Sequence, residues 1–202
     1  MKPKRLTARQ TEQIQKAVWL HQNGRWPEAE AEYKSLLNAL PSHPQLLTGL
    51  GTLALQQCSF EQADRLLARS LQVLPNQAQA QCNRGAALAK LNRRQEALCC
   101  YRQAIALQPD YALAHNNRGL VLKELQRCEE ALSAYDEALR IKPDYADAYY
   151  NRAIVFQQLN QLAAAADGYQ TAIALRPNFA EANYNLGITL KDMKLFEQAV
   201  AA

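Results

Sequence analysis

Proline recurs at an interval of 34 residues through most of this 202-residue chain, at Pro41, Pro75, Pro109, Pro143 and Pro177. Other residue types keep the same interval. Alanine does so from Ala29 to Ala199, and glycine does so at Gly51, Gly85, Gly119 and Gly187. A tyrosine column shares the register, at Tyr33, Tyr101, Tyr135 and Tyr169. Several independent columns in one register predict an architecture built from internal repeats.

Each repeat is predicted to form two helices joined by a short turn. A strong N-cap residue follows each proline, at Ser42, Asn76, Asp110, Asp144 and Asn178. Ser42 with Gln45 has the pattern of a capping box, so a first helix, helix A, is expected to begin there. It ends at a polar break such as Asn23-Gly24, where Gly24 suits a left-handed C-cap. A second helix, helix B, starts near Pro27 and its equivalents.

Two helices joined by a few residues pack antiparallel. If each repeat is numbered so that its proline is position 32, position 8 of helix A is glycine or alanine. We expect this small residue to face the alanine at position 20 of helix B, with the aromatic residue at position 24 beside the contact. In the fourth repeat these residues are Gly119, Ala131 and Tyr135.

These columns resemble the tetratricopeptide repeat, and the resemblance covers residues 10–202. It is clearest from Asn83-Arg84-Gly85 to Pro109-Asp110-Tyr111 and in the repeat that follows. The resemblance implies an all-α fold, a right-handed superhelical solenoid of antiparallel helical hairpins. It places a basic tail at residues 1–9, five full repeats at 10–43, 44–77, 78–111, 112–145 and 146–179, and a partial sixth at 180–202.

In this family the A helices line a concave groove, so positions 2, 5, 6, 9, 12 and 13 are expected to face it. Position 6 is asparagine in four repeats, although asparagine is a mediocre helix former. Amides both donate and accept hydrogen bonds, so a row of them could hold the backbone of an extended peptide. This resembles the asparagine ladder of O-linked N-acetylglucosamine transferases. Alternatively, the amides bond within the scaffold. The candidate peptide-binding residues are Asn83, Asn117, Asn151, Asn185, Asn116, Tyr150, Tyr184, Lys123 and Gln157.

Two further groups of side chains have alternative interpretations. Tyr150 and Tyr184 favour the C-terminal half of the groove as an anchor, unless they pack against a neighbouring A helix. Cys82, at the same position 5, is expected to be a small groove residue. Arginine replaces the usual leucine of position 7 at Arg84, Arg118 and Arg152. This row could bind an acidic peptide, or its stems could cover apolar surface while the charges reach water or an unidentified acid.

The sequence lacks the residues for one peptide-binding mode of the family, the carboxylate clamp. Some of its members clamp a C-terminal carboxylate with a basic residue at position 5 and asparagine at position 9 of one repeat. Here position 5 is never basic, and position 9 is largely apolar. The groove is therefore expected to suit a peptide backbone or apolar side chains.

Composition and motifs exclude several other functions. Four basic residues precede the first acid, and the remaining 19 basic and 19 acidic residues balance, so we expect no nucleic-acid partner. The basic tail is a solvated terminus or touches an anionic surface. No targeting segment or apolar run of the ~18–20 residues that span a bilayer is found, so no membrane is expected. The odd number of cysteines predicts free thiols and a cytoplasmic location. No metal site, cofactor site or catalytic motif is predicted.

Two functional hypotheses follow. The chain is a protein-protein interaction module, or it is the substrate-recruiting arm of a larger enzyme. The second rests on a resemblance of Leu20-His21-Gln22-Asn23-Gly24 and Leu50-Gly51-Thr52-Leu53-Ala54-Leu55 to the openings of bacterial proteins with a glycosyltransferase or sulfotransferase domain. The sixth repeat is expected to stop just after its helix B begins, as in a truncated chain or the N-terminal part of a longer protein. Self-association through that unfinished repeat is a third hypothesis.

Overall fold

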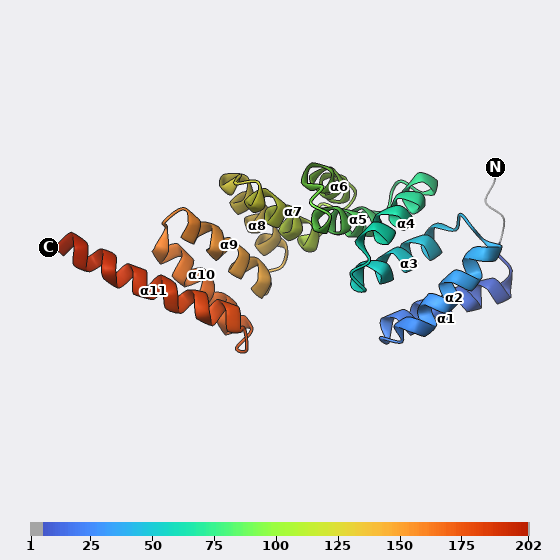
Figure 1. Cartoon of the computed structure of the whole chain (residues 1–202), viewed down its shortest axis with the longest axis horizontal. Coiled ribbons are helices and arrows are strands. Elements are labelled where there is room, and N and C mark those ends of the chain that lie inside the picture. Colours follow the sequence, from blue (N-terminus) through green and yellow to red (C-terminus); the bar gives the residue numbers. More distant parts are fainter. Residues whose placement is uncertain (1–5, 202) are drawn as a thin grey trace. The chain divides into compact units, whose positions relative to one another are not determined.

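The computed structural model describes residues 6–201, with side chains described up to residue 194. Of the basic tail, residues 1–5 lie outside this range, and the first helix already begins at Ala8. Helices are the only regular elements in the described part (Figure 1). They are α1 (Ala8–Gln22), α2 (Trp26–Ala39), α3 (Pro44–Gln56), α4 (Phe60–Val73), α5 (Ala78–Lys90), α6 (Arg94–Leu107), α7 (Ala112–Glu124), α8 (Cys128–Ile141), α9 (Ala146–Gln158), α10 (Leu162–Leu175) and α11 (Ala180–Ala201).

The helices form two compact units, Met1–Leu107 with α1 to α6 and Gln108–Ala202 with α7 to α11. Within each unit, every odd-numbered helix up to α9 packs against the helix that follows it, and these pairs are the predicted hairpins. Neighbouring hairpins then pack on one another, because a single hairpin cannot bury both of its apolar faces. The predicted all-α fold of stacked helical hairpins is confirmed.

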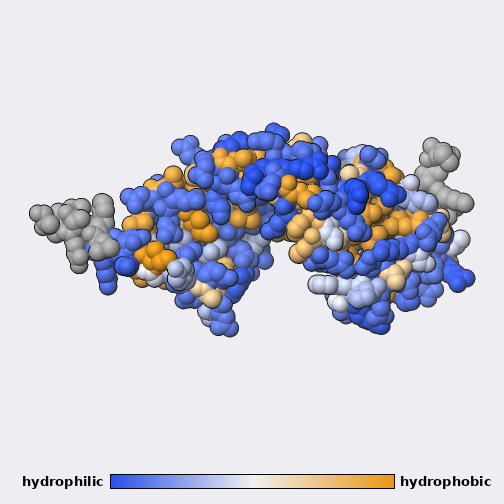
Figure 2. Space-filling view, in the orientation of Figure 1, coloured by the Kyte–Doolittle hydropathy of each residue, from blue (hydrophilic) through white to orange (hydrophobic). Residues whose placement is uncertain are grey.

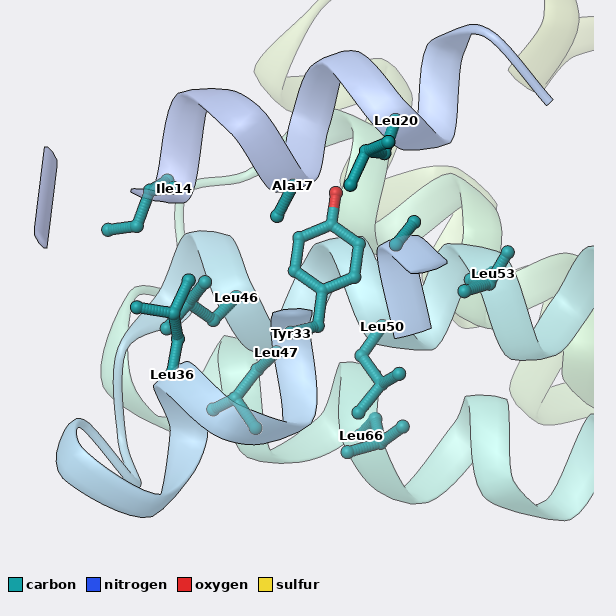
Figure 3. Close-up of a cluster of buried hydrophobic side chains, with 11 residues drawn as sticks. Ile14, Ala17, Leu20, Tyr33, Leu36, Leu46, Leu47, Leu50, Leu53 and Leu66 are labelled. Atoms are coloured by element: carbon teal, nitrogen blue, oxygen red, sulfur yellow. The ribbon is translucent and has the colours of Figure 1, made fainter. Parts of the chain in front are cut away.

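In the second, third and fourth hairpins a glycine of helix A lies close to a leucine or tyrosine side chain of helix B. A Cβ atom added to Gly85 would lie 2.7 Å from Cε1 of Tyr101, and one added to Gly119 would lie 2.6 Å from Cε1 of Tyr135. In the first hairpin Tyr33 points from α2 toward Ala17 and Leu20 of α1 (Figure 3). The small column is therefore confirmed, and the side chain nearest to its glycines is that of position 24.

The turn inside each hairpin contains one left-handed residue at position 15. Gly24 has a φ of 73°, which confirms the predicted C-cap. The same position has a positive φ in the next four repeats, at Cys58, Asn92, Gln126 and Asn160. The N–H of the following residue then donates to the carbonyl five residues earlier, as in a Schellman motif; that of Arg127 donates to Leu122 O at 2.9 Å.

The predicted N-caps of the A helices were wrong. The N-caps of α3, α5, α7 and α9 are His43, Gln77, Tyr111 and Tyr145, and none of them makes a side-chain cap bond. The polar residue before each N-cap belongs to the turn, and its backbone carbonyl rather than its side chain accepts a hydrogen bond. For example, the N–H of Ala112 donates to Asp110 O at 3.1 Å. The capping box at Ser42 is absent from α3, whereas one forms at the start of α1 between Thr7 and Gln10.

The sixth repeat also differs from the prediction. Its two expected helices form one continuous helix, α11. Position 15 of this repeat is Lys194, and a lysine in left-handed geometry costs free energy that a packed helix B must offset. Among the described residues no heavy atom lies within 4 Å of a Cβ added to Gly187, although the equivalent glycines of three other hairpins meet helix B. The helix therefore continues.

Two glycine substitutions test the close approach. Gly119→Ala places a methyl group against the Tyr135 ring and should lower the free energy of unfolding by about 1–3 kcal/mol. Gly187→Ala meets open space within a helix and should raise it by about 0.5–1 kcal/mol. Urea denaturation of both variants measures the difference. Equal effects of the two substitutions would contradict the packing role of position 8.

A second pair tests the left-handed turn. Gln126→Gly removes the strain of a side chain at positive φ and should stabilise the protein by about 0.5–1 kcal/mol. Gln103→Gly, at an exposed site inside α6, should destabilise it by about 1 kcal/mol. Chemical denaturation compares them, and a loss of stability in both variants would reject the assignment of strain to Gln126.

Candidate functional site

A pocket of about 660 Å³ opens in the first unit among α1, α2, α3 and the start of α5. This volume is within the range of sites that hold small ligands or short peptide segments. Most of its lining residues occupy the positions predicted to face the groove. The lining consists of Val18, His21, Gln22, Gly24, Trp26, Tyr33, Gln45, Thr48, Gly49, Thr52, Gln56, Gln77 and Gln79. The sequence reasoning identified these positions but favoured the C-terminal half of the chain.

The wall of this pocket around His21 is held by hydrogen bonds and close packing. His21 Nε2 lies 2.8 Å from Gln56 Oε1, and its Nδ1 lies 3.4 Å from the hydroxyl of Tyr33. Gly49 replaces the asparagine of position 6, and a Cβ there would lie 2.6 Å from Cζ of Tyr33. This glycine allows the tyrosine to reach α3, so a residue that packs the hairpin also lines the pocket.

The other wall uses hydroxyl and amide groups. The hydroxyls of Thr48 and Ser70 lie 2.8 Å apart, and Gln77 Nε2 donates to Ser70 at 3.0 Å. Thr52 accepts a bond from Asn83 at 2.9 Å. These groups are committed to the scaffold. By contrast, Gln22, Gln45 and Gln79 are exposed, and their amides make no hydrogen bond to another described residue.

The asparagine row bonds partly within the scaffold, as the alternative interpretation proposed. Besides Asn83, Asn151 donates to Asn116 Oδ1 at 3.1 Å and Asn185 donates to the hydroxyl of Tyr150 at 3.3 Å. Asn116 in turn donates to Asn117 Oδ1 at 3.3 Å. Asn116 and Asn151 are buried, whereas Asn117 is half-buried. Each bond runs between neighbouring A helices or along one helix.

The predicted residues of position 5 have three different environments. Tyr150 packs against Phe179 and Tyr169, with ring centroids 4.8 and 5.9 Å away, and burial raises the pKa of its hydroxyl. Tyr184 is 71% exposed and therefore available to a partner. Cys82 is only 1% exposed, so its expected place in the groove was wrong. The helix backbone turns it into the stack.

The arginines of position 7 reach acids on helix B, which the sequence did not identify. Arg84 Nε lies 2.7 Å from Asp64, which also binds Arg93 at 2.7 Å. Arg152 lies 2.6 Å from Asp136 and covers the rings of Tyr149 and Phe156. These arginines therefore serve the scaffold. Arg118 is half-buried on α7.

The remaining predicted site residues occupy position 12. Gln157 accepts a bond from the hydroxyl of Tyr169 at 2.8 Å, and burial raises the pKa of that hydroxyl to about 12. Lys123 is half-buried on α7, and burial lowers the pKa of its ammonium group. Gln157 therefore lies beside the tyrosine column, and neither side chain is fully solvated.

Three further features concern chemistry. Within residues 6–194 no three His, Cys, Asp or Glu side chains gather as metal ligands, and none of the thiols forms a disulfide. Burial raises the pKa of Cys100 to about 11, so this thiol is a poor nucleophile. None of the described helices has the length and hydrophobicity needed to cross a membrane. The face seen in Figure 2 is mainly hydrophilic, with hydrophobic residues in small groups.

Family profiles match almost the whole repeat region. A profile described as "TPR repeat" matches residues 90–126, 121–160 and 156–194, and one described as "Tetratricopeptide repeat" matches residues 20–91. The chain therefore belongs to the tetratricopeptide repeat family. No curated protein sequence matches it significantly.

Solved structures share the fold at low sequence identity. A crystal structure of MamA is 24% identical, with a TM-score of 0.71 over 82% of this chain and 96% of that one. YrrB, described as "a TPR protein with an unusual peptide-binding site", is 22% identical, with a TM-score of 0.70 over 86% and 89%. A thermophilic TPR protein of Thermus thermophilus is 20% identical, with a TM-score of 0.72 over 90% and 98%. At such identities the likeness establishes the fold alone.

Two ion pairs of similar length differ in burial, so they can test whether a buried pair stabilises the fold more than an exposed pair does. The carboxylate of Asp64 is 12% exposed in its pair with Arg84, whereas that of Asp136 is 59% exposed in its pair with Arg152. Asp64→Asn should cost about 1–3 kcal/mol because the nearly buried carboxylate that accepts from both Arg84 and Arg93 loses its charge. Asp136→Asn should cost less than about 1 kcal/mol. Thermal denaturation measures both, and equal losses would contradict the structural role of Asp64.

Proposed function

We propose that this protein is an interaction module that holds an extended peptide segment of a partner against its A helices. The pocket of the first unit carries this proposal, because the positions that line it are those that packing leaves free. Its walls are held by hydrogen bonds before any ligand arrives, so little side-chain ordering is needed on binding. Three exposed glutamines at its rim remain available to a peptide backbone.

The asparagine row supports the same proposal in a modified form. Asn83, Asn151 and Asn185 each use one amide hydrogen within the scaffold. An amide has a second hydrogen and a carbonyl oxygen, so the half-buried side chains of Asn83 and Asn185 keep groups that a peptide could bond, whereas buried Asn151 bonds Asn116. Tyr184 adds an exposed aromatic anchor in the second unit. Scaffold bonding therefore orients the amides for a ligand rather than consuming them.

The charge of the chain and one structural neighbour both favour a protein or peptide as the partner. YrrB is described as having a peptide-binding site, and it shares this fold. The balanced charge of the chain outside its N-terminal residues favours a protein partner over nucleic acid. The thiols fit a reducing compartment such as the cytoplasm. No feature of the matched profiles favours a recruiting arm of a glycosyltransferase or sulfotransferase. Self-association through the sixth repeat stays a separate prediction.

Trp26 offers a direct test, because it lines the pocket and Trp19 is the only other tryptophan. In a Trp19→Phe background, titration with members of a capped peptide library should change the fluorescence of Trp26. Adding Gln45→Ala and Gln79→Ala should weaken the best binder about thirtyfold, since each lost hydrogen bond is worth about 1 kcal/mol. Circular dichroism should show unchanged helicity.

Gln103→Ala is the matched control, because it removes an exposed glutamine of α6 that does not line the pocket. It should leave both affinity and helicity unchanged. Equal affinity of the double glutamine variant and its parent would refute the pocket as the peptide site.

A further inference from the structure

Positions 12 and 24 form a hydrogen-bonded pair in the first and fifth hairpins. The hydroxyl of Tyr33 lies 3.4 Å from His21 Nδ1, and that of Tyr169 donates to Gln157 at 2.8 Å. The fourth repeat has Lys123 and Tyr135 at these two positions. A lysine ammonium group donates hydrogen bonds and cannot accept one, so it cannot replace the acceptors of the other two hairpins.

The tyrosine of this hairpin is correspondingly unsatisfied. Tyr135 is fully buried, and its hydroxyl has no hydrogen-bond partner among the described residues. A buried hydroxyl without a partner lowers the stability of the fold. A glutamine at position 12 would avoid this loss, as Gln157 does in the next hairpin. The lysine is therefore unfavourable for the scaffold that contains it.

The charge of Lys123 is not balanced by its own scaffold. It is half-buried and makes no ion pair with any residue that the structure describes. Neutral amides occupy the neighbouring A-helix positions, at Asn116 and Asn117 on α7 and Gln157 on α9. Glu124, the next residue along α7, is exposed and favours the charged form of Lys123. Desolvation without a paired anion is costly, so the site favours an incoming negative charge.

We propose that Lys123 is an anion-binding residue that receives the carboxylate of an aspartate or glutamate side chain in a bound peptide. This rests on the proposed function and adds a sequence preference to it. The ammonium group would donate charge-assisted hydrogen bonds to the carboxylate oxygens. A single carboxylate suits one partly desolvated lysine, and the amides nearby can donate to its remaining lone pairs. The site differs from a C-terminal carboxylate clamp, because it lies at position 12.

Thermal stability gives the first test, and it needs no ligand. Lys123→Gln recreates the glutamine–tyrosine pair of the next hairpin and should raise Tm by about 2–4 °C. Arg102→Gln makes the same change of charge at an exposed site of α6 and should leave Tm unchanged. A lower Tm for Lys123→Gln would show that the lysine supports the fold, and would overturn the proposal.

Peptide binding gives the second test. Capped peptides of Ser, Thr, Ala and Gln carry one Glu, whose position is varied, and each is compared with the same peptide that has Gln in place of Glu. The wild-type protein should prefer the best Glu peptide about tenfold over its Gln counterpart. Lys123→Gln should abolish this preference, and Arg102→Gln should retain it. Added salt should reduce the preference less than it reduces an exposed ion pair, because Lys123 is half-buried.

The outcomes separate this site from the function on which it rests. If peptides bind without any preference for Glu, or if the preference survives in Lys123→Gln, the anion site is rejected and the interaction module stands. If no peptide of either series or of the wider library binds, both proposals are rejected. A rise in Tm together with loss of the Glu preference supports a lysine that is present for binding rather than for stability.

Discussion

The contact between a small residue at position 8 and a large one at position 24 determines much of this structure. Glycine at Gly85 or Gly119 leaves room for a tyrosine ring within the hairpin, and a methyl group there would overlap it. In the first and fifth hairpins, where position 8 is alanine, the tyrosine hydroxyl reaches position 12 of the A helix. One packing rule therefore sets both the spacing of the helices and the chemistry of the proposed binding surface. Position 12 becomes the place where stability and recognition compete.

The two units use this scaffold for different chemistry. Among the described residues that line the first-unit pocket there is no Asp, Glu, Lys or Arg, and recognition there would depend on amides, hydroxyls and one tryptophan. In the second unit the equivalent surface contains Lys123 and the exposed ring of Tyr184. Repeat proteins can vary a surface in this way because the positions that pack and the positions that bind are separate.

Most of the fold could be predicted because repeat columns report packing directly. The hairpins, the left-handed turn at Gly24 and the small residue at position 8 all follow from local geometry. The prediction of the N-caps was wrong because the residue after each proline accepts a hydrogen bond in a turn through its backbone carbonyl. Residue type alone does not distinguish such a turn residue from an N-cap. The prediction that Cys82 faces the groove was wrong because position 5 lies at the border between the packed stack and the surface. A small apolar side chain at this position is buried in the stack.

By itself the sequence determined the family, the helical hairpins and the positions that can face a ligand, because a 34-residue period leaves few ways to bury its apolar columns. Only the tertiary structure decided how those positions are used. It showed which amides are bonded to neighbouring helices, that Arg84 is paired with Asp64, and that α11 continues without a turn. It also showed that the Tyr135 hydroxyl lacks a partner among the described residues. These facts depend on side chains from different helices meeting in space, and a column of residue types does not contain that distance.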